Sequence, residues 1–429
     1  MQSSTTSSYA RYRLLSSLGG KLADALAVLI AIRTLPAEQY GIIGTALGVM
    51  AVVGFVNLTP EDILWRDMPR LRDRLSEHLS AYIWFWLVKS VGIAAVTAVF
   101  CSIYGLTHQS WNVAFTVFSI GLLLQLLTVS TLVEVPLFAG LEQQRGAAFV
   151  LGVRVLWLAL LAPNLWLRSL TYYIVALALY AATTAVWSGW LLRRQFGLRF
   201  AFDTSNAWNI VRQSALDLTL WLHLVGRARV FLQRGDLAIL GGLGVGLAAL
   251  GQYTVAVNLV GFALILPGVL ENVAAVSFAH RPEHRSQSLR RFCLVAVTLA
   301  VAQFACGIAF GRWALRLLHV AEVEASYRIF ITLLGGVCGM VVAGPSLAYA
   351  MCFRKMQTAF ASVFLPAAVT FAVAIWLATK QWAVVGAATT HAAVSLLTGA
   401  AVIGVVVLGH DRPGGVEPET AEAESAFQE

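Results

Sequence analysis

Apolar stretches of about 20 residues recur along almost the whole chain, from residue 14 to residue 408. A helix needs about 20 mostly apolar residues to cross the hydrocarbon core of a bilayer. Only 12% of the residues are charged, whereas soluble domains average about 25%. The sequence therefore predicts an all-α, multi-pass membrane protein and excludes a soluble domain with a large core.

Short polar connections separate these stretches and fix their number. Twelve transmembrane helices are expected, at 14–33, 40–58, 80–104, 112–138, 147–166, 170–191, 213–238, 251–276, 290–311, 328–350, 357–378 and 383–408. The N-terminal residues resemble the start of a signal peptide, but Lys21 and Asp24 interrupt the apolar run and no small-residue cleavage site follows. We therefore expect a retained first helix.

The distribution of Arg and Lys over the loops predicts the orientation. Cytoplasmic loops carry an excess of basic residues. If the N-terminus is inside, most loop Arg and Lys residues fall on the inner side, and the outer loops carry only Arg33, Arg168, Arg312, Arg316, Arg328 and Lys380. Both termini are thus predicted to be cytoplasmic. The net charge of +8 is explained by these loops, so no nucleic-acid partner is expected.

The cysteines and the glycines give no sign of a cofactor. The five cysteines are scattered, with no CxxC pair and no Cys/His ligand spacing, so neither a disulfide framework nor a metal site is predicted. The glycine run GGLGVG (241–246) lacks the pattern of a phosphate-binding loop. We expect no catalytic residues, no metal and no cofactor.

Two segments in the halves of the chain share a pattern. The segments around Gly41 and Gly251 align with an offset of 210 residues, and each follows the first predicted helix of its half. Internal repeats of this kind are common in secondary transporters. The alignment predicts a six-helix bundle at 1–200, a second one at 201–410, and a tail at 411–429 whose acidic, Gly/Pro-containing composition predicts a disordered cytoplasmic segment.

Three segments carry a family resemblance: IRTLPAEQYGIIGTALGVMAVVGFVNL, PLFAGLEQQRGAAFVLGVRVLWL and RGDLAILGGLGVGLAALGQYTVAVNLV. Their order and spacing resemble the Wzx-type O-antigen flippases of the multidrug/oligosaccharidyl-lipid/polysaccharide exporter superfamily. The resemblance implies two six-helix bundles around a central cavity in the bacterial inner membrane. It also implies an undecaprenyl-diphosphate-linked oligosaccharide as substrate, H⁺ or Na⁺ as coupling ion, and contacts with polysaccharide assembly proteins.

The segment VGRARVFLQRGD (225–236) places three arginines in eight residues. If it were a loop, the apolar pieces on either side would be too short to span, so one helix over 213–238 is expected. Such a helix has charges on two opposite faces and must lie between other helices and a cavity. Arg227 and Arg229 are then expected near mid-membrane, and Arg234 and Asp236 near the outer face.

Charged residues within the spans have two interpretations. The cations are Lys21, Lys89, Arg154, Arg227, Arg229 and Arg234, and the anions are Asp24, Glu134, Asp217, Asp236 and Glu271. Most of them can pair across helices and hold the bundle together, and Lys21 and Asp24 can pair at i, i+3. Alternatively, surplus cations line the cavity and bind an anionic headgroup, because Arg makes bidentate contacts to phosphate.

The second interpretation ranks the candidate residues. Arg227 is the first candidate for binding the diphosphate, followed by Lys21, Lys89, Arg229 and Arg154. Candidates for ion coupling are Asp24, Asp217, Glu271 and His223, whose imidazole can titrate near neutral pH.

Three functions are compatible with the pattern. A lipid-linked oligosaccharide flippase requires a cationic cavity. A drug or cation exporter of the same superfamily requires an anionic one. A membrane glycosyltransferase or polysaccharide polymerase commonly has a long outer loop, but the longest loops, 59–79 and 192–212, are predicted to be inside. The flippase is the function that the sequence favours.

Overall fold

A computed structural model of the chain describes residues 2–57, 75–139, 142–198, 208–209, 212, 220–280, 285–320, 322–353 and 359–410. Most of the predicted inner loops, Asp217 and the predicted tail at 411–429 lie outside the described residues. Every regular element that the structure describes is a helix. Helices are expected in a bilayer, because every backbone N–H and C=O must be paired within the segment.

The helices follow the predicted spans closely. In chain order they are α1 (Gln2–Thr34), α2 (Ala37–Val53), α4 (Leu75–His108), α5 (Trp111–Leu127), η4 (Thr128–Ser130), α6 (Thr131–Ala139), α7 (Gln143–Leu161), α8 (Asn164–Leu167), α9 (Leu170–Phe196), α11 (Leu220–Gly242), α12 (Leu247–Ala263), α13 (Ile265–His280), α14 (Arg285–Leu317), α15 (Val323–Phe353), η7 (Phe360–Phe364) and α17 (Leu365–His410).

Nine helices within the described residues are long and apolar enough to cross a membrane. Helix α2 is apolar but has 17 residues, and α11 carries the arginines of the 225–236 segment. Helix α17 contains non-helical backbone at Trp382 and Ala383, between the two spans predicted there. The predicted fold class, an all-α multi-pass membrane protein, is confirmed, while the number of twelve spans stays a prediction.

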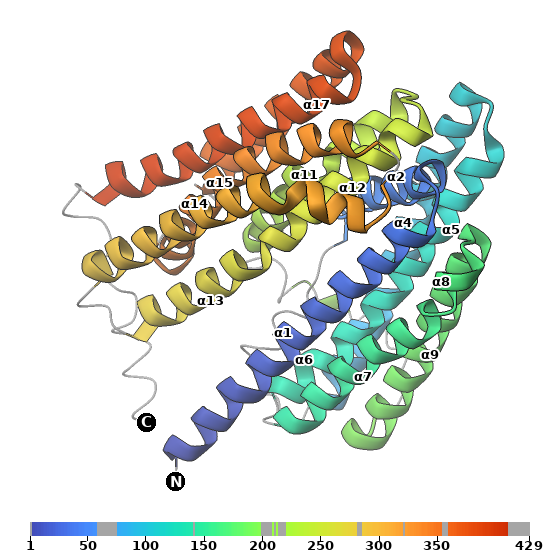
Figure 1. The fold of residues 1–429 in the computed structure, drawn as a ribbon. Coiled ribbons are helices and arrows are strands. Elements are labelled where there is room, and N and C mark those ends of the chain that lie inside the picture. Colours follow the sequence, from blue (N-terminus) through green and yellow to red (C-terminus); the bar gives the residue numbers. More distant parts are fainter. Residues whose placement is uncertain are drawn as a thin grey trace.

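The buried apolar side chains form two large clusters, one for each half of the chain. The first contains side chains from Ala27 to Leu198, joined by Val255, Leu315 and Leu318. The second runs from Val225 to Val402. Figure 1 shows two groups of helices that approach one another where α2, α11 and α12 lie and diverge toward the end where α1 begins. The predicted boundary at residue 200 is outside the described residues and stays a prediction.

Helices α2 and α12 pack against each other at unusually close range. A Cβ added to Gly41 would collide with the carbonyl oxygen of Leu247, and one added to Gly251 would collide with that of Ala37. Leu247 and Gly251 each follow their counterparts, Ala37 and Gly41, by the 210 residues of the sequence alignment. The two contacts are therefore equivalent under exchange of the halves. Gly41 also lies against Gly251, and Gly44 against Thr254, so the two helices run in the same direction.

Helix α11 occupies the centre of the molecule. It packs against α2, where a Cβ on Gly48 would collide with the backbone at Leu237 and Ala238, and against α17 and α12. Because α2 belongs to the first half and α17 to the second, α11 lies between the two groups of helices. This position decides where its charged side chains point.

Candidate functional site

Helix α11 forms one side of a cavity in the second half of the chain, and an ion pair lines this cavity. The guanidinium of Arg229 donates to both oxygens of Glu271 on α13, with Nη1–Oε1 at 2.7 Å and Nη2–Oε2 at 2.8 Å. This bidentate geometry is the strongest that Arg and a carboxylate form. Both side chains line a cavity of about 310 Å³ between α11, α12, α13, α15 and α17, which we call the C-cavity.

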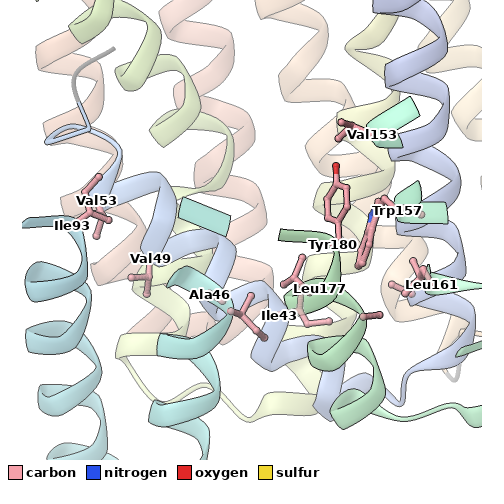
Figure 2. Packing of buried hydrophobic residues seen from close by; sticks show 14 of the residues in the cluster. Ile43, Ala46, Val49, Val53, Ile93, Val153, Trp157, Leu161, Leu177 and Tyr180 are labelled. Atoms are coloured by element: carbon pink, nitrogen blue, oxygen red, sulfur yellow. The ribbon is translucent and has the colours of Figure 1, made fainter. Parts of the chain in front are cut away.

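A second cavity, the N-cavity, lies mainly among α1, α2, α5, α7 and α9 and has a volume of about 340 Å³. Arg154 lines it and pairs with Asp24, Nη1 to Oδ1 at 3.1 Å. The same nitrogen lies 3.4 Å from the hydroxyl of Tyr180. The Tyr180 ring stacks on Trp157 with its centroid 5.0 Å away, and Figure 2 shows the two rings side by side. The N-cavity thus combines a neutralised charge pair with aromatic walls.

Arg234 of α11 is the residue that lines both cavities. Among the described residues, no carboxylate lies within 4.0 Å of its guanidinium and no hydrogen bond engages it. The titratable groups that interact with it electrostatically are Tyr40 and Asp236. Tyr40 itself accepts a hydrogen bond of 2.7 Å from Asn258. Arg234 is therefore a cation between the two cavities whose hydrogen-bond donors are available to a ligand.

Asp236 lies in the core of the second half. It is fully buried. Its Oδ2 accepts the hydroxyl of Tyr253 at 2.5 Å and lies 2.7 Å from Nδ1 of His391, and its Oδ1 accepts the backbone N–H of Leu237. Tyr253 comes from α12 and His391 from α17, so the carboxylate joins three helices. His391 also lines the C-cavity.

The remaining sequence candidates lie elsewhere around α11. Lys89 and His223 are buried, and His223 interacts electrostatically with both Lys89 and Arg227. The three form a separate group near the end of α2 and are not among the residues that line the two cavities. Lys21 reaches from α1 toward Gly268 of α13, at the wall of the C-cavity.

Asp24 pairs with Arg154 across helices, whereas the i, i+3 spacing predicted Lys21 as its partner. Asp217 lies outside the described residues. Of the candidates, the structure thus brings Arg154 and Asp24 together at one cavity and Arg229 and Glu271 at the other. Within the described residues, no group of three His, Cys, Asp or Glu side chains is placed to hold a metal ion.

Sequence reasoning missed Arg234 and His391 as site residues. The sequence predicted that the span with Arg234 ends at residue 238, whereas α11 extends to Gly242. His391 stands alone in an apolar stretch, and only its contact with Asp236, 155 residues away, shows its role. The helical spacing that places Arg234 on the face of Arg227 was the available signal.

Comparisons of the sequence find no matching family model and no matching curated protein. Solved structures do match over nearly the full length. A multidrug resistance MATE family transporter of the MOP superfamily, in its inward-facing conformation, has a TM-score of 0.66 at 11% identity, covering 92% of this chain and 96% of that chain.

The lipid II flippase MurJ, in an inward closed conformation, has a TM-score of 0.65 at 10% identity, covering 93% of this chain and 87% of that chain. This chain has the same fold as these two solved transporters. The MATE transporter VcmN of Vibrio cholerae adds a TM-score of 0.55 at 13% identity, over 95% of this chain and 98% of that chain. Because these identities are low, the likeness establishes the shared fold and leaves the substrate to the chemistry of the cavities.

Proposed function

We propose that this protein is a flippase that moves an undecaprenyl-diphosphate-linked oligosaccharide across the bacterial inner membrane by alternating access of its two halves. The observation that carries the proposal is the charge of the two cavities. Three arginines line them, Arg154, Arg229 and Arg234, against two carboxylates, Asp24 and Glu271. Both carboxylates are paired, so Arg234 is the unmatched charge, and it is positive.

An unmatched arginine inside a membrane protein requires a reason. On insertion scales, an arginine at mid-membrane costs about 2.5–3.5 kcal/mol. That penalty persists only where the charge serves a partner, and the planar guanidinium matches the geometry of a phosphate. Arg234 lines both cavities, so a diphosphate bound there extends its sugars into one cavity or the other.

The walls of the N-cavity suit a glycan. Tyr40, Trp157, Tyr173, Tyr180 and Asn258 line it, and they combine flat apolar surfaces with hydroxyl, indole and amide groups. Such amphipathic side chains contact a sugar ring with an apolar face and a polar tip. Binding and release of such a substrate need neither a metal nor a nucleophile.

The comparisons favour transport in general, and the charge favours the anionic substrate. MurJ is described as a lipid II flippase and the other relatives as MATE transporters. An exporter of cationic drugs requires a surplus of carboxylates, opposite to the surplus around Arg234. Cytoplasmic placement of both termini, coupling to H⁺ or Na⁺, and contacts with polysaccharide assembly proteins belong to the same proposal.

A complementation series in a strain that lacks the gene tests the proposal. Surface polysaccharide and lipid-linked precursor are scored for wild type, Arg234→Gln, Arg234→Lys and Arg227→Ala, with membrane levels measured in parallel. Arg316→Gln is the control, because Arg316 is an exposed arginine of α14.

Wild type and the control are expected to restore the polymer, whereas Arg234→Gln inserts normally and leaves precursor trapped inside. Arg234→Lys is expected to restore the polymer partly, since it keeps the charge without the bidentate fork. If deletion of the gene changes neither polysaccharide nor precursor but raises drug sensitivity, the exporter replaces the flippase. If Arg227→Ala alone traps the precursor, the headgroup is bound at the Lys89–His223–Arg227 group instead.

A further inference from the structure

The buried carboxylate of Asp236 fixes how His391 can use its two ring nitrogens. An ionised carboxylate only accepts hydrogen bonds, so Nδ1 of His391, 2.7 Å from Oδ2, must donate to it. Tyr253 donates to the same oxygen and the Leu237 N–H to the other. Nε2 of His391 therefore remains as the basic nitrogen. His391 is 3% exposed, and that exposure is toward the C-cavity, which it lines.

We propose that His391 is a proton-dependent anion-binding group of the C-cavity: Nε2 takes up one proton when the diphosphate arrives, and the resulting N–H donates to a phosphate oxygen beside Arg234. The inference rests on the proposed function and adds to it a titratable subsite. The proton comes from hydronium or buffer acid in the solvent that reaches the cavity, stays on Nε2 while the anion is bound, and returns to the solvent on release.

The charges that surround His391 set the sign of this coupling. Asp236 favours the imidazolium, and the hydroxyl of Tyr253 is neutral. Arg229 and Glu271 in the same cavity neutralise each other. Arg234 remains, and its positive charge disfavours a second positive charge on His391 as long as no anion is bound. A bound diphosphate reverses that effect, because it attracts both cations at once.

Proton and anion therefore bind with positive coupling. Linkage is reciprocal, so if the anion raises the affinity of His391 for a proton, lower pH raises the affinity for the anion by the same factor. For one proton the largest effect is about tenfold in affinity for each pH unit. In transport terms, at most one proton is carried with each headgroup.

Calorimetry on the purified full-length protein tests this inference. The probe is a citronellyl-diphospho-hexose, a short-chain analogue of the proposed substrate. Both of its phosphates are diesters, which do not titrate near neutral pH, unlike the terminal phosphate of a monoester. Binding heats at pH 7.5 in two buffers of different ionisation enthalpy give the number of protons taken up for each probe bound.

The variants isolate His391. His391→Asn keeps an N–H donor toward Asp236 at the position of Nδ1 but cannot be protonated, and His391→Gln serves if the Asn variant does not fold. His319→Asn is the matched control, because His319 is exposed and its left-handed backbone (φ 58°) suits Asn. Wild type and the control are expected to take up a fraction of one proton and to bind more tightly as pH falls.

His391→Asn is expected to bind the probe more weakly below pH 7, with no proton uptake and no pH dependence. If wild type binds without uptake, or if uptake survives in both His391 variants, the inference is wrong and the proposed function stands. If His223→Asn abolishes uptake instead, the proton site is on the other buried histidine. If wild type does not bind the probe at all, the proposed function fails and this inference with it.

Discussion

The close packing of α2 on α12 predicts that two similar glycine-to-alanine substitutions change the stability of the protein in opposite directions. In Gly251→Ala, the added methyl collides with the carbonyl oxygen of Ala37. Backbone cannot swing aside as a side chain can, so the helices must separate. Overpacking of this kind costs about 1–3 kcal/mol. In Gly189→Ala, on α9, the methyl meets open space, and removing a glycine from a helix interior stabilises by about 1 kcal/mol.

The two variants should therefore differ by about 2–4 kcal/mol. Purified protein is heated in detergent at one fixed rate, because membrane proteins unfold irreversibly and the apparent midpoint depends on the rate. The fraction that stays monodisperse is then followed by size-exclusion chromatography. Gly251→Ala should lose monodispersity at a lower temperature than wild type, and Gly189→Ala at an equal or higher one. Equal midpoints for the two variants would refute the packing described for α2 and α12.

Two charge pairs give further predictions. Arg229→Gln should destabilise the protein by about 3 kcal/mol, because it leaves a partly buried carboxylate unpaired. Adding Glu271→Gln should recover most of the loss in the same heating assay. A double variant as unstable as the single one would contradict the pairing. Arg154→Gln should change stability by less than about 1 kcal/mol, because its partner Asp24 is 46% exposed and solvated pairs contribute little. A larger loss that Asp24→Asn does not reverse would show that Arg154 is held by other contacts.

Most of the fold could be predicted from the length of the apolar runs in the sequence. Long apolar runs bounded by charged loops predict spans directly, and even the break between the last two spans coincides with the non-helical backbone at Trp382 and Ala383. The 210-residue alignment is matched by the reciprocal contacts of Gly41 and Gly251. Glycine patterns are informative here because a close helix–helix approach inside a membrane depends on small residues.

The site was less predictable, because charge pairing between helices depends on rotation and depth. Arginines and carboxylates from the predicted spans do line two cavities. The sequence did not show which of these residues pair. Asp24 pairs with Arg154 and not with Lys21 because of the way α7 packs against α1. The hydrogen bond between Asp236 and His391 joins two helices 155 residues apart, and no local pattern encodes such a contact.

The reciprocal contact between α2 and α12 also has a meaning for the origin of the chain. A surface on which Gly41 meets Leu247, the counterpart of Ala37, while Ala37 meets Gly251, the counterpart of Gly41, is self-complementary in the sense that a two-fold dimer requires. A polypeptide of half the length, carrying only those positions, would possess the interface needed to pair with a second copy of itself. The contact between α2 and α12 is then the former subunit boundary. Duplication would have freed the second copy to acquire Arg234, Asp236 and His391, for which a symmetric dimer has no use on one side alone.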